Sequence, residues 1–161
     1  MPYRTSRNFE ASVIDFINEK LDATGSGWSN IRVEKSFSYV YDGALPCICV
    51  RVGTTEHTRA EIGGTSTYRT ANILIDIFAT SDGIRLDLKD WLIANIRAGV
   101  IYYNYTIVNG ATDSKVEDGR INILNIDDVP IDFDMDKDKL DVADRYRHLI
   151  TLSVSLGQIE S

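Results

Sequence analysis

The stretch "YRTANILIDIFAT" (residues 68–80) decides the fold, because it carries the strongest strand pattern in the chain. Four side chains alternate toward one face and two toward the other: Ala71, Ile73, Ile75 and Ile77 against Leu74 and Phe78. A strand that is apolar on both faces is expected to lie in the middle of a sheet and to be covered. Ser81 or Asp82 follows at once and is a suitable helix cap. The strand therefore leads directly into a helix.

That helix is expected over residues 82–99. Its apolar positions follow the helical period and are Ile84, Leu88, Trp91, Leu92 and Ile96. Gly99 suits the C-terminal cap. We expect Trp91 to pack from the helix onto the sheet, and residues 71–79 and 84–96 together to form the folding core.

The N-terminal third predicts a helix and a hairpin. Thr5 or Ser6 can cap a helix whose apolar positions are Phe9, Val13, Phe16, Ile17 and Leu21, ending before the turn-rich "TGSG" at 24–27. Residues 31–41 alternate as a strand, Asp42-Gly43 is a turn signal, and residues 45–53 read as the returning strand. The polar segment 54–67, with Gly63-Gly64, predicts a long loop or an extended, mobile hairpin tip.

The C-terminal part predicts three further strands. Residues 100–108 and 120–126 have strand character and are separated by an expected loop at 109–119. An acidic loop at 127–144 leads to a last strand at 145–157, whose alternation is regular. The order of elements predicts one α+β domain over residues 1–161: a mainly antiparallel β-sheet with two helices packed on one face.

The composition is that of a soluble globular protein. The 161 residues are 43% apolar and 25% charged, and the longest apolar runs are too short to span a bilayer. The N-terminus has no signal-peptide pattern, so we expect cytosolic synthesis. Cys47 and Cys49 form a C-x-C within an apolar run and are interpreted as small buried residues rather than redox or metal groups.

The net charge of −7 is unevenly distributed. Residues 127–144 hold eight aspartates against two lysines, whereas residues 1–100 carry 12 acids and 11 bases. Such a chain has no basic surface for gripping phosphates, and repulsion from DNA is expected.

The segment "DFDMDKDKLD" (132–141) invites a metal-site interpretation, with carboxylates at Asp132, Asp134, Asp136 and Asp138. An EF-hand loop needs glycine at its sixth position and glutamate at its twelfth. Counting from Asp132, those positions are Lys137 and Ala143; counting from Asp134, they are Lys139 and Arg145. Both frames fail, so we expect a solvated acidic loop, with no metal and no cofactor.

Catalytic patterns are also lacking. The sequence has no phosphate-binding glycine loop and no G-x-S-x-G nucleophile pattern. His57 falls in a polar segment and is expected to face solvent, whereas His148 lies on the apolar face of the last strand as a core or interface residue. The chain is not expected to be an enzyme.

Several features, taken in their order along the chain, resemble the layout of a known protein family. These are the helix "FEASVIDFINEKL", the strand "NILIDIFAT" running into the helix "SDGIRLDLKDWLIANI", a variable acidic segment, and the closing "DRYRHLITLSVSLG". This layout, over nearly the whole chain, resembles the tail-terminator (tail-completion) family of tailed bacteriophages. No motif in it is individually diagnostic, and the family prescribes no catalytic residues.

The resemblance implies a structural protein of the virion tail or neck, assembled in the host cytoplasm. Such proteins form a homo-oligomeric ring, usually a hexamer, on the tail tube protein, stop tube growth, and dock the head-tail connector or head-closure protein. DNA would pass through the ring without specific binding, and no membrane is involved. Six copies at −7 each would carry about −42, which suits a channel that does not trap phosphates.

The candidate assembly contacts are Glu56, His57, Arg59 and Glu61, because both signs of charge within six residues suit pairing with a neighbouring subunit. Asp132, Asp134, Asp136 and Asp138 are the candidate acidic channel or surface loop. Three alternatives stay open: a head-closure or neck adaptor protein of the same virion, a small monomeric protein-binding domain, and a metal-dependent enzyme built on the aspartates.

Overall fold

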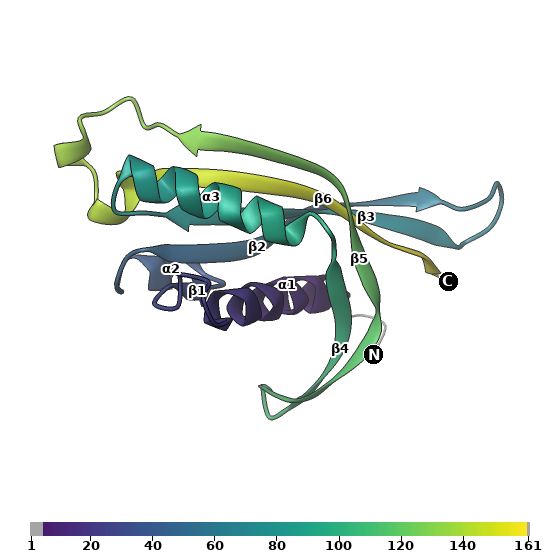
Figure 1. Ribbon diagram of the computed structural model, residues 1–161. Coiled ribbons are helices and arrows are strands. Elements are labelled where there is room, and N and C mark those ends of the chain that lie inside the picture. The colour runs from purple at the N-terminus through teal and green to yellow at the C-terminus, as the bar shows by residue number, and fades with distance from the viewer. Residues whose placement is uncertain (1–4, 161) are drawn as a thin grey trace.

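The computed structural model describes residues 5–160 and shows a mixed α and β protein built on one curled six-stranded sheet (Figure 1). Its elements in chain order are α1 (Thr5–Asp22), β1 (Arg32–Glu34), α2 (Phe37–Val40), β2 (Cys47–Arg59), β3 (Thr67–Phe78), α3 (Asp82–Ile96), β4 (Val100–Val108), β5 (Ala111–Ile131) and β6 (Arg147–Glu160). Two short 3-10 helices, at Lys137–Lys139 and Val142–Asp144, lie between β5 and β6. The strand order is β1-β2-β3-β6-β5-β4, and only β1 and β2 pair in parallel. The predicted mainly antiparallel sheet is confirmed.

Strand β3 lies inside the sheet, as the sequence predicts. It pairs with β2 on one side and with β6 on the other, so that Ile75 lies opposite Val50 and Ile150. All three side chains are fully buried. Because this strand is paired on both sides over most of its length, its β-branched residues pack against neighbours on both flanks as well as on the face.

The two faces of the sheet carry different clusters. The main core cluster joins buried strand residues to α1 and α3, through residues such as Phe9, Val13, Ile17, Leu88, Leu92 and Ile96. Cys47 and Cys49 alternate with Ile48 and Val50 along β2, so they point to the opposite face. There they pack with Phe78 and with Val40 of α2. The third helix, which the sequence does not predict, therefore belongs to a second, smaller cluster.

Helix α1 connects the two edges of the curled sheet. It contacts β1 and β2 near one edge and β4 at the other edge, and Figure 1 shows the helix between them. The backbone N–H of Tyr103 on β4 donates to Ser12 Oγ at 3.0 Å, and Asn8 Nδ2 donates to Tyr102 Oη at 3.1 Å. These bonds satisfy polar groups along the strand that would otherwise be buried without partners. Thr5 and Ser6, the expected caps, both lie inside this helix.

Helix α3 follows the sequence prediction closely. Ser81 is its N-cap, and its side chain accepts from the backbone N–H of Ile84 at 3.3 Å. The helix ends at Ile96, and Gly99 follows with a φ of 95°, which favours glycine. Trp91 packs half-buried against the core, with its ring centroid 6.5 Å from that of Trp28. Among the helices within residues 5–160, none combines the length and apolar content needed to span a membrane.

The prediction of a strand over 31–41 is wrong in most of its length. Only Arg32–Glu34 form a strand, and the chain then turns through α2. Phe37, Val40 and Tyr41 are spaced three and four residues apart, so one helical turn points them to the same side. Arg32 holds this turn, because its guanidinium donates to the carbonyls of Tyr39 and Val40 at 2.7 Å each. Tyr39 is exposed.

The prediction of a loop over 109–119 is also wrong. The turn between β4 and β5 is confined to Asn109 and Gly110, which have φ of 52° and 81°. Asn-Gly with both φ positive is the turn that matches the twist of a tight β-hairpin. β5 begins at Ala111 and runs for 21 residues, pairing first with β4 and then with β6. Its end takes residues 127–131 out of the predicted acidic loop.

Candidate functional site

The β2–β3 hairpin extends beyond the core as an arm, defined here as residues 53–70. The register between the two strands shifts between Val52 and Thr55, at Gly53. From Gly53 onward the residues of β2 are exposed, apart from the half-buried Thr55. In Figure 1 the arm forms one end of the elongated sheet. Of the two expectations for 54–67, the extended hairpin is correct and the long loop is wrong.

The structure brings the four predicted assembly residues together on this arm. Glu56, His57 and Arg59 lie on β2 and Glu61 lies in the turn, all of them exposed. His57 faces solvent, as the sequence predicts, opposite Arg69 of β3. Arg59 Nη1 donates to the carbonyl of Gly64, which ties the turn to the strand.

The sequence analysis misses the most exposed apolar residue of the arm. Ile62 lies at the hairpin tip with a relative exposure of 105%, and Tyr68 and Ile159 near the same end are also exposed. An isoleucine held fully in water at the end of a paired hairpin lacks the burial that would stabilise it by about 2 kcal/mol. Its position next to two glycines is the sequence signal for a tip residue.

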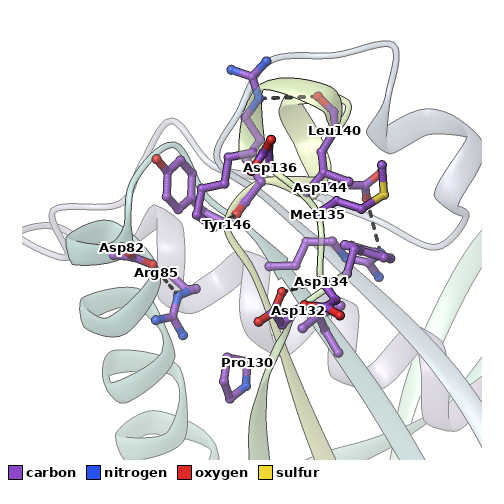
Figure 2. Close-up of a pocket in the computed structure, with 15 residues that line it drawn as sticks. Asp82, Arg85, Pro130, Asp132, Asp134, Met135, Asp136, Leu140, Asp144 and Tyr146 are labelled. Carbon is purple, nitrogen blue, oxygen red and sulfur yellow. Dashed lines mark hydrogen bonds and ion pairs between the residues drawn. The ribbon is translucent and has the colours of Figure 1, made fainter.

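The acidic loop lies at the other end of the molecule. In Figure 1 the chain between β5 and β6 lies at the end of the sheet opposite the arm, so the two predicted sites do not come together. Asp132 accepts from the backbone N–H of Asp134 at 2.9 Å, and Asp136 lies 3.7 Å from Lys139 Nζ. Figure 2 shows Asp132, Asp134 and Asp136 spread along the loop. Within residues 5–160 no three carboxylates, histidines or cysteines gather as metal ligands would.

A hollow of about 520 Å³ lies between this loop and the start of α3 (Figure 2). Its cations are already engaged by neighbouring groups. Arg85 pairs with Asp82 at 3.2 Å, and Lys137 donates to the carbonyl of Arg145 at 2.7 Å. Arg145 in turn donates to the carbonyl of Leu140 at 3.4 Å. Among its described lining residues, the hollow thus offers exposed carboxylates and no unengaged cation for an anionic ligand.

Buried charges hold this end of the sheet together. The Asp76 carboxylate on β3 is 2% exposed and accepts from Arg51 at 3.0 Å and from Arg147 at 3.1 Å. Arg147 also pairs with Asp144 at 3.2 Å, which fixes the end of the acidic loop to β6. Tyr41 Oη also donates to Asp144 at 2.9 Å, and Ala143 is buried in the second, smaller cluster, so several contacts anchor the end of the loop.

His148 occupies a second charged cluster beneath α3. Arg85 can only donate, so His148 Nδ1 accepts from it at 2.7 Å and Nε2–H donates to Asp128 at 2.7 Å. Lys89 lies 3.5 Å from the same carboxylate. The hydrogen bond from His148 and the charge of Lys89 lower the pKa of Asp128. His148 is 2% exposed, so it is a satisfied core residue without access to a substrate.

The cysteines are buried as predicted. Cys47 and Cys49 are free and have no solvent exposure. Burial raises the pKa of Cys47 to about 11 and that of Cys49 to about 12. Both thiols therefore stay protonated at neutral pH, which removes the thiolate that redox chemistry and metal binding require.

Comparison with protein-family models and with curated proteins finds no match for this chain.

Proposed function

We propose that the chain is a structural virion protein, a tail terminator or neck component that forms a ring on the tail tube. The expected ring has six copies, joins the tube to the head connector and carries no enzymatic activity. On this proposal α1 and α3 cover one face of the sheet, and the strands and loops at the two ends of the molecule make the assembly contacts.

The observation that carries the proposal is the arm. Its outer part is paired as a hairpin, is exposed and carries both signs of charge, with Ile62 at its tip. A hairpin that projects past its own core offers strand edges and side chains to a second protein. The acidic loop offers a second, chemically different surface at the opposite end, as a ring between two partners requires.

Replacing residues 56–62 with a Gly/Ser linker tests this role. The monomer is expected to stay folded, because the buried parts of β2 and β3 are untouched. Ring formation and capping of tail tubes are expected to weaken, because the predicted contacts are gone. Circular dichroism checks the fold; light scattering and micrographs of mixtures with tail tube protein check the assembly.

A matched linker in the acidic loop, replacing residues 133–139, serves as the comparison. It removes a similar length of exposed chain and leaves the arm intact. Rings are expected to persist in this variant. If the arm variant still forms rings that cap tubes at normal length, the arm has no role in assembly.

A further inference from the structure

A groove of about 380 Å³ lies along the outer surface of α1. One wall is the edge strand β1, through Val33 and the following residues, and the other wall includes Tyr105 of β4. Ala11 and Ile14 of α1 also line it. Since β1 is the outermost strand at its side of the sheet, its outer edge has no strand partner among the described residues.

The charged residues of this groove divide into satisfied and unsatisfied groups. Asp15 accepts from Tyr105 Oη at 2.6 Å, and Glu34 pairs with Arg32 at 3.1 Å. Arg7, Lys35 and Glu10 make no ion pair or hydrogen bond within the described part of the chain; Arg7 and Lys35 are exposed, and Glu10 is half-buried. Burial raises the pKa of Glu10, and the charges of Lys35 and Arg7 oppose that rise, so both cations lie near enough to Glu10 to interact with it. Together the three side chains leave one net positive charge in the groove for a partner.

The outer part of the arm has an excess of acid. Glu56 and Glu61 are exposed, whereas Arg59, the cation between them, already donates to the carbonyl of Gly64. Ile62 adds an apolar tip that no residue of the described range 5–160 covers. The groove therefore matches the arm in charge, and its Ile14 and Val33 match the arm in apolar character.

We propose that the groove on α1 receives the arm of a second copy of this chain. Glu56 and Glu61 of the incoming arm lie against Arg7 and Lys35, and Ile62 packs beside Ile14. The contact joins two different surfaces, so each copy gives one arm and receives one. Such a contact closes into a ring when the rotation between neighbouring copies divides a full turn. This inference rests on the proposed ring and names the surfaces that form it.

Charge reversal tests the pairing. The arm variant carries Glu56→Lys and Glu61→Lys, the groove variant carries Arg7→Glu and Lys35→Glu, and the combined variant carries all four and keeps the native charge of −7. Sedimentation velocity is expected to show that each pair of reversals raises the protein concentration needed for assembly by about tenfold or more, because like charges then meet. The combined variant is expected to return to within about threefold of the native protein. Reversing Arg97, an exposed cation outside the groove, the arm and the acidic loop, is the control and is expected to change little.

Disulfide trapping gives a second measurement on the same contact. The double variant Ile14→Cys and Ile62→Cys is expected to give covalent chains longer than two copies on oxidation, whereas either single substitution is not. The two native cysteines are buried and do not interfere. The native protein could form rings while no charge reversal weakens them and the double cysteine variant does not crosslink. That result would overturn the pairing of arm and groove but not the ring. A native protein that stays a single chain at every concentration would overturn the ring and the pairing together.

Discussion

Asp76 shows how one residue fixes the geometry of the end that carries the acidic loop. Its carboxylate is 2% exposed and lies between Arg51 of β2 and Arg147 of β6, so three neighbouring strands meet on one charge. A buried carboxylate persists only when its partners replace the lost hydration. Arg147 also pairs with Asp144, which couples the acidic loop to the sheet.

The substitution Asp76→Asn is expected to lower the free energy of unfolding by about 3 kcal/mol, because two guanidinium groups then lose their buried anion. Urea unfolding followed by circular dichroism measures the change. Asp138→Asn, in the exposed loop, is the matched control and is expected to stay within about 0.5 kcal/mol of the native protein. Equal effects of the two substitutions would show that Asp76 is not structural.

Asp128 gives a dependence on pH. Its carboxylate is stabilised by His148 and Lys89, so its pKa in the folded state lies below the ordinary value of 3.8. A carboxyl with a lowered pKa contributes stability above its unfolded pKa and loses that contribution as the pH falls through the folded value. The native protein is therefore expected to exceed Asp128→Asn in stability at pH 7, and the difference is expected to shrink below about pH 4. Unfolding of the native protein and of Asp128→Asn, measured at pH 7 and again below about pH 4, checks this. A stability difference that is larger in acid would contradict it.

At the scale of elements, the β4–β5 turn requires a residue that tolerates a positive φ. Gly110 has a φ of 81°, and an added Cβ would meet no atom within 4 Å, so the cost of Gly110→Ala is purely conformational. We expect it to destabilise the protein by about 1–2 kcal/mol. Gly83→Ala, in the first turn of α3 and without positive φ, is the control and is expected to stabilise by about 0.5–1 kcal/mol. Thermal melts that shift in the same direction for both would contradict the assigned turn.

Trp91 belongs to the same scale, because it joins α3 to the core beside Trp28. It is half-buried, so Trp91→Ala is expected to cost about 3 kcal/mol, at the lower end for truncation of a large aromatic residue. Leu86→Ala, at an exposed position of the same helix, is expected to cost less than about 0.5 kcal/mol. A Trp91 variant that melts within a degree or two of the native protein would show that the helix packs elsewhere.

The elements that can be predicted from the sequence are those whose pattern is local and strongly periodic. β3, α3 and β6 follow from alternating or helical apolar spacing, and Ser81 marks the start of α3. The β4–β5 hairpin contains the Asn-Gly signal, but β5 has ten exposed residues at its start and so lacks the apolar alternation that reveals a strand. Its pairing comes from a neighbouring strand, which a reading of local hydrophobicity does not detect.

The candidate site is predictable only in part, for a related reason. The charges of the arm are visible at 56–61, yet the groove combines α1, β1 and β4, which are distant in the sequence. The short strand β1 and helix α2 depend on Arg32, whose hydrogen bonds to the carbonyls of Tyr39 and Val40 give no periodic pattern. Hydrogen bonds from a side chain of this kind become visible only in the folded structure.

At the scale of the whole molecule, the arm and the acidic loop lie at opposite ends of one curled sheet (Figure 1). Buried ion pairs anchor the loop, whereas the outer part of the arm makes few contacts with its own chain. This asymmetry suits a subunit that is rigid through its core and completed by neighbours at its ends.

The mass of the purified full chain in solution tests the ring most directly. Sedimentation velocity or light scattering over a range of concentrations is expected to give a single closed species with a defined multiple of the 18.1 kDa subunit, six in the expected ring, and micrographs of the same sample are expected to show rings. The population of that species should grow with concentration and then stop at one size, because a closed ring leaves no free arm. A mass of one subunit at every concentration, or an open series of ever longer chains, would contradict the ring.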